Sequence, residues 1–226
     1  MFGLPASTEY NKRIPKQKFY DNIAVTPAMK RVFVEKIKSI YWRNKISTST
    51  INLAPGDNVT EIEVFEVKLE EQSLDETILR MIDRQIPYHI VFALEYGGKY
   101  QIWMSYKEIL SNGRNACKVS GYYHTEWNSH DMIHLLIEGV DIDSVYENFI
   151  RQVMGDSFVA DNDEPLKVAL ERIERRKRVK AEIERIEKRI WSETQPKKKY
   201  KLYESLKKQQ AIWEEMNNGE IGNADK

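Results

Sequence analysis

The most constraining feature of the chain lies between residues 60 and 106, where sequence patterns typical of a strand, a helix and further strands follow one another. Residues 60–69 alternate polar and apolar side chains as a strand does, and residues 73–86 carry apolar side chains at helical spacing. Residues 88–96 form a nearly continuous apolar run, which is typical of a central strand covered on both faces. Strand, helix and strand joined by short loops predict a βαβ unit if the two strands run parallel.

The glycine pair at residues 97–98 favours a tight turn into an antiparallel strand over residues 100–106. The sheet is therefore expected to be mixed. Further strands are expected over residues 48–53 and 118–127, and residues 133–137 are expected to form either one more short strand or part of a bridging segment. The fold class that follows is α+β, with a mixed β-sheet, flanking helices and a C-terminal antiparallel helical hairpin or coiled coil.

The N-terminal half opens with an extended arm that carries two prolines, followed by a helix predicted to begin at Thr26-Pro27. Apolar side chains recur at three- and four-residue spacing as far as Tyr41, which predicts a helix over residues 26–41. A serine and a glutamate three residues apart, Ser73 and Glu76, form a capping-box pattern before the next helix.

The C-terminal third changes character, because two long charged helices follow an acidic stretch. Both carry apolar residues at heptad-like spacing, and Gln195-Pro196 separates them. The predicted organisation is a mixed α/β domain with an N-terminal arm over residues 1–155, an acidic linker over 156–164, a helical hairpin over 165–218 and a disordered tail over 219–226.

Composition limits the class of protein. The chain is 41% hydrophobic and 31% charged, which supports a folded core and excludes wholesale disorder. Lys plus Arg and Asp plus Glu both number 35, so no global basic field draws the chain to nucleic acid. A single cysteine excludes an internal disulfide, and no secretory signal pattern is present. We expect a cytoplasmic protein.

Two patterns point toward metal chemistry. Glu66 and Lys68 on a strand, after a turn that contains Asp57, match the acid and (Asp/Glu)-x-Lys pattern of one class of metal-dependent nucleases. His130 and His134 are four residues apart, which on a helix would place two imidazoles on one side as a zinc site requires. Short matches of this kind arise often by chance. A half-exposed strand and surface histidines are the default interpretations, and no catalytic residue, metal or cofactor is assigned.

Basic side chains give the candidates for contact with a nucleic-acid backbone. Two lie on the exposed face of the first helix, and four follow the break between the C-terminal helices without an acidic neighbour. They are Lys30, Lys36, Lys197, Lys198, Lys199 and Lys201.

The apolar stripe of the C-terminal helices gives the candidates for contact with a partner protein or a second copy of the chain. Mixed-charge helices with a thin apolar seam tend to pair with another helix. The stripe residues are Ile183, Ile186, Ile190, Leu206 and Trp213.

Several phrases of the sequence together resemble the DUF4391 family. They are Met1-Phe-Gly-Leu-Pro, Asn44-Lys-Ile-Ser, Ile82-Asp-x-x-Ile-Pro87, Thr125-Glu-Trp127 and Tyr146-Glu-Asn148. The resemblance implies an accessory protein of bacterial or archaeal loci that encode helicases and DNA methyltransferases, in restriction-like or phage-defence settings. It brings no established catalytic residues.

The leading hypothesis is therefore a non-enzymatic accessory or scaffold subunit that binds a protein partner, with a helicase or methyltransferase as the partner that the resemblance implies. A metal-dependent nuclease and a nucleic-acid-binding module are the alternatives.

Overall fold

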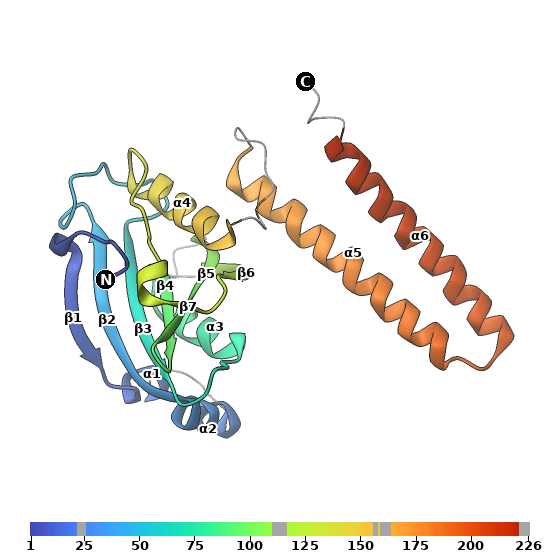
Figure 1. Cartoon of the computed structure of the whole chain (residues 1–226), viewed down its shortest axis with the longest axis horizontal. Coiled ribbons are helices and arrows are strands. Elements are labelled where there is room, and N and C mark those ends of the chain that lie inside the picture. Colours follow the sequence, from blue (N-terminus) through green and yellow to red (C-terminus); the bar gives the residue numbers. More distant parts are fainter. Residues whose placement is uncertain (22–25, 110–116, 156–157, 159–163, 222–226) are drawn as a thin grey trace. The chain divides into compact units, whose positions relative to one another are not determined.

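The computed structural model describes residues 1–21, 26–109, 117–155, 158 and 164–221. It divides into two compact units, Met1–Phe158 and Val159–Lys226. The first unit contains the β-sheet and the second contains two long helices (Figure 1). Among the described residues, no helix combines the length and the apolar character needed to cross a membrane.

The first unit is built on a seven-stranded sheet in the order β1-β2-β3-β4-β5-β6, with β7 paired to β5. Only β3 and β4 run parallel, and every other neighbouring pair is antiparallel. The strands are β1 (Glu9–Ile14), β2 (Ile37–Ser47), β3 (Glu61–Leu69), β4 (His89–Tyr96), β5 (Lys99–Ile109), β6 (Cys117–His124) and β7 (Asn128–Ser129).

Helices flank this mixed sheet, so the predicted α+β class is confirmed. The helix α3 connects β3 to the parallel strand β4, which is the strand–helix–strand unit that the sequence predicted. The helices of the first unit are α1 (Gln17–Asp21), α2 (Pro27–Lys36), α3 (Glu76–Gln85) and α4 (Ile142–Met154), with 3-10 turns η1 (Ala6–Thr8) and η2 (His130–Met132).

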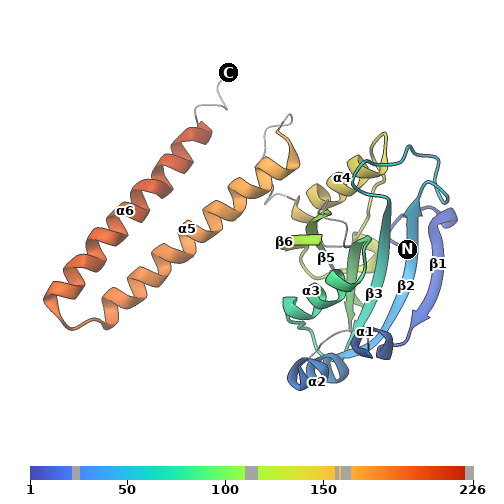
Figure 2. The ribbon, with the colours of Figure 1, turned by 180° about the vertical axis from the view of Figure 1, so that it is seen from behind.

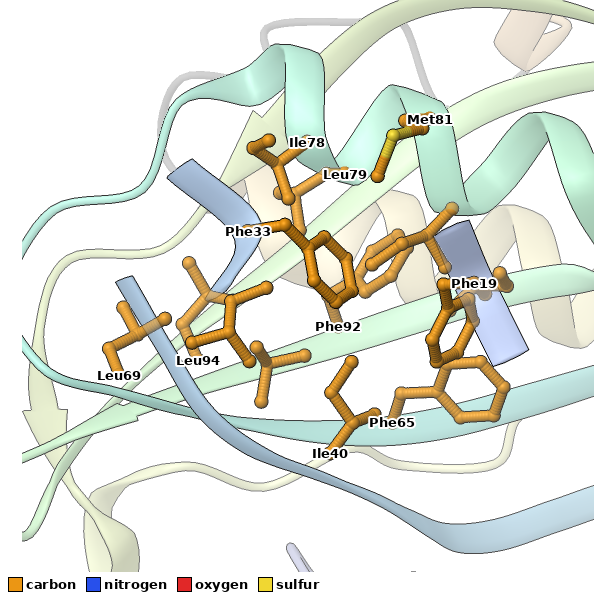
Figure 3. Packing of buried hydrophobic residues seen from close by; sticks show 14 of the residues in the cluster. Phe19, Phe33, Ile40, Phe65, Leu69, Ile78, Leu79, Met81, Phe92 and Leu94 are labelled. Carbon is orange, nitrogen blue, oxygen red and sulfur yellow. The ribbon is translucent and has the colours of Figure 1, made fainter. Parts of the chain in front are cut away.

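Each face of the sheet carries its own apolar layer. On one face, Phe19, Phe33 and Phe92 belong to a cluster that joins α1, α2 and α3 to the strands (Figure 3). Val91 points the opposite way from Phe92 because successive strand residues alternate, and it is also fully buried. Helix α4 covers that second face with residues such as Phe149. The burial of β4 on both faces matches its continuous apolar sequence.

The helix predicted over residues 26–41 is wrong in its last third. Helix α2 ends at Lys36, and β2 begins at the next residue. The Lys16 ammonium accounts locally for this end, because it donates hydrogen bonds to the carbonyls of Val34 and Ile37. Residues 37–47 are rich in β-branched and aromatic side chains and pair along β3, so sheet pairing prevails over the helical spacing.

Other boundaries also differ from the prediction. The N-terminal arm contains the edge strand β1. Asp75 rather than Ser73 caps α3, since its carboxylate accepts a hydrogen bond from the Thr77 amide. Residues 48–53 form turns, and residues 133–137 form no strand.

The loop between β2 and β3 is held by one carboxylate of α4. Asp143 accepts hydrogen bonds from the backbone N–H groups of Asp57 (3.0 Å), Asn58 (3.2 Å) and Val59. Gly56 allows this approach, because a Cβ atom there would lie 2.2 Å from Asp143 Oδ1. This contact ties the helix α4 to a turn more than eighty residues earlier in the chain.

The second unit is the predicted helical hairpin. Its helices are α5 (Leu166–Ser192) and α6 (Pro196–Ile221), and they lie side by side in both views of the molecule (Figures 1 and 2). Helix α6 continues to Ile221, beyond the predicted end of the hairpin at residue 218. Most of the predicted acidic linker, and residues 222–226 of the predicted tail, lie outside the described residues.

Candidate functional site

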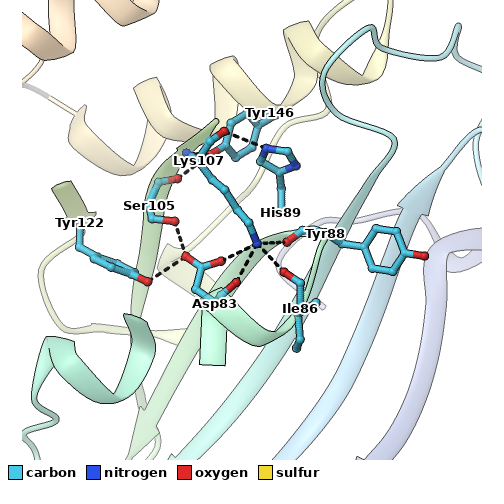
Figure 4. Close-up of polar contacts among 8 residues, drawn as sticks. All are labelled: Asp83, Ile86, Tyr88, His89, Ser105, Lys107, Tyr122 and Tyr146. Atoms are coloured by element: carbon cyan, nitrogen blue, oxygen red, sulfur yellow. Dashed lines mark hydrogen bonds and ion pairs between the residues drawn. The ribbon is translucent and has the colours of Figure 1, made fainter. Parts of the chain in front are cut away.

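A buried ion pair joins α3 to β5. The Lys107 ammonium lies 3.2 Å from Asp83 Oδ1, and both side chains are almost completely buried. Lys107 also donates to the carbonyl of Asp83 in the last turn of α3 and to those of Ile86 and Tyr88 just beyond its end (Figure 4). The lysine therefore satisfies carbonyl groups that a helix end leaves without internal partners.

The remaining groups around this ion pair are hydrogen-bonded as well. The Asp83 carboxylate accepts hydrogen bonds from the hydroxyls of Ser105 and Tyr122. Burial, and then the neighbouring Asp83 carboxylate, raise the pKa of Tyr122, so this phenol stays protonated. A buried charge is tolerated when its pairing is this complete.

Tyr146 of α4 completes the network at an irregularity of β5. The pairing of β5 with β6 shifts register between Ser105 and Lys107. There the Tyr146 hydroxyl accepts a hydrogen bond from the Lys107 N–H (3.0 Å) and donates to the Ser105 carbonyl (2.5 Å). His89 Nε2 contacts the Lys107 carbonyl at 3.1 Å, and burial lowers the pKa of His89 to about 4. These contacts make the network a structural junction of α3, α4 and the sheet.

The residues of the nuclease pattern make separate contacts. Glu66 is buried, and its carboxylate accepts hydrogen bonds from the Arg43 guanidinium (2.6 Å) and the Tyr100 hydroxyl (3.1 Å). Lys68 lies 3.9 Å from Glu95, and Asp57 belongs to the loop held by the carboxylate of α4. Over the described ranges, no group of three or more His, Cys, Asp or Glu side chains is placed to hold a metal ion.

The two histidines of the zinc pattern do not share a helix. His130 opens the short turn η2, which ends at Met132, and His134 follows it outside any regular element. The His130 ring packs against Phe2 and Tyr100, with ring centres 5.1 and 5.5 Å apart. The spacing that would align two imidazoles on a helix is therefore not realised.

An apolar cavity lies beside the middle of β3. Its volume is about 480 Å³, and its lining residues come from α1, β1, β2, β3 and the end of α3. The walls carry the aromatic side chains Phe19, Trp42, Phe65 and Tyr88. Glu63 also lines the cavity and is only 1% exposed.

The carboxyl group of Glu63 is the unusual polar group of this cavity. Both of its oxygens are buried, and within the described part of the chain no N–H group donates a hydrogen bond to either of them; the neighbouring carboxylate of Glu61 is the group to which the protonated Glu63 donates. Burial, and then the nearby Glu61 carboxylate, raise the pKa of Glu63 to about 9. Burial alone would raise the pKa of Glu61, but its interactions with Glu63 and with the paired Lys45 ammonium lower it. Two neighbouring carboxyl groups thus differ in protonation at neutral pH, which is a frequent property of functional sites.

In the second unit, the apolar stripe packs within the hairpin. Ile186 and Ile190 of α5 are buried, and Ile183, Leu206 and Trp213 are half-buried. Arg176 of α5 lies over the Trp213 ring of α6 at 5.4 Å. The structure therefore uses much of this stripe to join the two helices, and its role in binding a partner stays a prediction.

The turn of the hairpin exposes three large aromatic side chains, Trp191, Tyr200 and Tyr203. We call these side chains, together with the neighbouring lysines Lys197, Lys198, Lys199 and Lys201, the hairpin tip. Trp191 is 89% exposed, Tyr200 65% and Tyr203 52%. Trp191, Tyr203 and Lys199 line a surface hollow of about 460 Å³, and Glu187 also belongs to its lining. Lys197, Lys198 and Lys201 occupy the same end of α6, and the described residues include no carboxylate paired with any of these four lysines.

The two other predicted nucleic-acid contacts lie on α2 in the first unit. Lys36 is paired with Glu71 at 2.7 Å. Lys30 is exposed. These lysines belong to a different unit from the hairpin tip.

Sequence reasoning missed Glu63 and the three aromatic residues of the hairpin tip. The signal for Glu63 was its place on the same strand face as Phe65, a face that the pattern makes mostly apolar. The signal at the tip was that Trp191, Tyr200 and Tyr203 fall outside the heptad seam, where a large aromatic residue has no internal partner.

A comparison with protein-family models matches residues 2–212 to DUF4391, described as a domain of unknown function. The match covers most of the 226 residues and confirms the family resemblance found in the sequence. Comparisons with curated proteins and with solved structures give no match.

Proposed function

The chain belongs to the DUF4391 family, whose description gives no function, and we propose that it is an accessory protein that binds single-stranded nucleic acid at the hairpin tip. The observation that carries this proposal is the meeting of three exposed aromatic side chains with a cluster of lysines. Proteins that hold single strands without sequence preference combine these two features, because bases stack on aromatic rings while cations follow the phosphates.

The exposure of the aromatic residues supports a binding role. A tryptophan left 89% exposed gains almost nothing from folding, although burial of its large apolar surface is favourable. Tyr203 faces the same hollow from the other helix. Two rings presented by two rigid helices offer a fixed platform on which unpaired bases can stack.

The local charge supports the same ligand. Residues 188–208 contain eight Lys or Arg and two Glu, a net charge of +6, although the whole chain is balanced at zero. A basic region of this kind attracts a polyanion and repels a second copy of itself. The lysine side chains extend from the first turns of α6, next to the aromatic residues. Charge complementarity therefore favours nucleic acid over self-association at this surface.

The wider setting is part of the proposal. The family resemblance favours a DNA-processing or phage-defence system in the cytoplasm, with a helicase or DNA methyltransferase as protein partner. In that setting the hairpin would hold the strand that the partner separates or modifies, and the α/β unit would contact the partner. The nuclease alternative has less support, since Glu66 is already engaged by Arg43 and Tyr100.

The direct test is fluorescence anisotropy of the full-length protein with a labelled 20-nucleotide poly(dT) strand and the matching duplex. We expect tighter binding to the single strand. Loss of a stacked base costs about 1–3 kcal/mol, so Trp191→Ala should weaken binding by roughly five- to 150-fold. Tyr96→Ala removes a partly exposed tyrosine of the first unit and serves as the matched control.

Two results would contradict the proposal. One is the absence of binding to every oligonucleotide at low salt. The other is an equal loss in Trp191→Ala and Tyr96→Ala, which would mean that the tip is not the contact surface. A protein that captures its partner but no oligonucleotide would assign the exposed aromatic residues to a protein interface instead.

A further inference from the structure

The surface hollow at the hairpin tip is built by facing turns of the two long helices. Its lining comes equally from both: Glu187, Ile190 and Trp191 of α5, and Lys199, Tyr203 and Leu206 of α6. Within each helix these residues lie one turn apart, a spacing that places side chains on one face. The hollow measures about 460 Å³, which is within the size range of sites for small organic groups.

The apolar part of the lining suits the face of a flat ring. Ile190 is 6% exposed and Leu206 is half-buried, whereas Trp191 and Tyr203 extend into solvent from different helices. Flat rings stack on such aromatic side chains or pack edge-to-face against them. A nucleobase has a flat face of this kind, so the hollow can hold one base of a bound strand.

Two side chains of opposite charge share the hollow without pairing. Among the described residues, neither Glu187 nor Lys199 makes an ion pair or a side-chain hydrogen bond. Lys199 is half-buried, whereas Lys197, Lys198 and Lys201 are exposed. The hollow therefore presents one carboxylate and one ammonium group that are both available to a ligand.

The carboxylate decides which part of a nucleotide can enter. Glu187 offers hydrogen-bond acceptors only, and its negative charge repels a phosphate group. Phosphates are attracted instead to Lys197, Lys198 and Lys201, which do not belong to the lining. A base is uncharged and carries N–H donors, so it is the part of the strand that fits beside Glu187.

Guanine matches this pair of charged groups better than the other bases. Its Watson–Crick edge carries the N1–H and the N2 amino donors side by side, and the two oxygens of a carboxylate can accept from both. Its O6 and N7 acceptors follow on the same side of the ring, and a lysine is a common donor to them. Adenine and cytosine place a ring lone pair beside their one amino group, and thymine has a single N–H between two carbonyls.

We propose that the hollow holds one guanine base of a single strand, with Glu187 accepting from N1–H and the N2 amino group and Lys199 donating to O6. Trp191 and Tyr203 pack against the ring. This inference rests on the function proposed for the hairpin tip and adds a base preference at one position of the strand.

The test is fluorescence anisotropy of the full-length protein with three labelled strands of about nine nucleotides at one fixed salt concentration. Each strand is thymidine throughout except at its centre, which carries guanine, hypoxanthine or thymine. Hypoxanthine keeps the ring, O6, N7 and N1–H of guanine but lacks the amino group. We expect the guanine strand to bind about tenfold more tightly than the hypoxanthine strand, because one hydrogen bond to a charged group is lost.

Glu187→Gln separates base recognition from general attraction to the strand. Glutamine keeps one acceptor oxygen but turns an N–H donor toward the base, so most of the preference for guanine over hypoxanthine should disappear. The same change removes a negative charge and should leave the all-thymine strand bound as tightly as before or more tightly. Glu171→Gln makes the same charge change at an exposed position of α5 outside the hollow, and it should keep the preference.

The possible outcomes distinguish this inference from the function on which it rests. Equal binding of the three strands that is still weakened by Trp191→Ala would refute the guanine site and leave the proposed function intact. A Glu187→Gln protein that keeps the preference, or a Glu171→Gln protein that loses it equally, would also refute the site. Absence of binding to all three strands would refute both proposals.

Discussion

The buried carboxyl group of Glu63 should make the stability of the first unit depend on pH in an unusual direction. Its pKa rises from 4.5 in an unfolded chain to about 9 in the folded protein. Between these values the folded state binds a proton that the unfolded state has lost. Stability is therefore complete below pH 4.5 and falls as the pH rises toward about 9.

The size of the effect follows from the same shift. One pKa unit corresponds to 1.36 kcal/mol, so the slope is at most about 1.4 kcal/mol of unfolding free energy per pH unit. The full span between the two pKa values sets a ceiling of about 6 kcal/mol. This is a large part of the roughly 5–15 kcal/mol by which domains are stable.

Glu63→Gln is the perturbation that isolates this contribution. Glutamine has nearly the shape of the protonated glutamate but does not titrate, so its contribution is constant with pH. We expect the variant to gain stability over the wild type steadily from pH 6.5 to pH 9. The range begins at pH 6.5 because His89 has its own titration below that value.

Urea unfolding followed by circular dichroism at several pH values measures the difference. The midpoint of the wild type should fall with pH while the slope with urea stays the same, and the two proteins should diverge. Curves for the wild type and Glu63→Gln that remain parallel from pH 6.5 to 9 would refute the reasoning. They would mean that Glu63 is ionised in the folded protein.

Three further predictions concern the junctions of the first unit. Tyr146→Phe leaves the Lys107 N–H and a β5 carbonyl without a partner, and thermal or urea unfolding should show a loss of about 1–3 kcal/mol. Gly56→Ala places a Cβ atom against Asp143, so urea unfolding should show a loss of about 1–3 kcal/mol; an unchanged midpoint would mean that the loop moves freely. His89 is buried and neutral with a pKa of about 4, so stability should fall as the pH drops from 6.5 toward 4, and His89→Gln should reduce that acid sensitivity; identical acid transitions would contradict this.

Local sequence patterns correctly predicted those helices and strands whose pattern of apolar residues matches their burial in the folded protein. The continuous apolar run of β4 is buried on both faces, and the Gly97-Gly98 turn joins β4 to β5 as expected. The heptad spacing and the break at Gln195-Pro196 predicted the hairpin of α5 and α6. In the strand and in the hairpin, the spacing of the apolar residues matches the side of the element that is buried in the structure.

The sequence misled where long-range contacts decide the structure. Ile37 and Ile40 fit a helical stripe, but pairing with β3 and the cap provided by Lys16 place them in β2. The role of Tyr146 depends on a register shift in β5, which no local pattern reveals.

The candidate sites were only partly visible for the same reason. The lysines of the hairpin tip stood out as a run, whereas the exposure of Trp191 depends on which face of α5 meets α6. Glu63 is an ordinary strand residue in sequence, and only the packing of α1 and β2 beside it creates a cavity.

The salt dependence of oligonucleotide binding tests the proposed function most directly. If Lys197, Lys198, Lys199 and Lys201 all contact phosphates, the logarithm of the binding constant should fall against the logarithm of salt concentration with a slope of about −3. Replacing all four with glutamine should bring that slope close to zero, while Lys180→Gln on the exposed face of α5 should leave it unchanged. A quadruple variant that keeps the affinity and the salt slope of the wild type would contradict nucleic-acid binding at the hairpin tip.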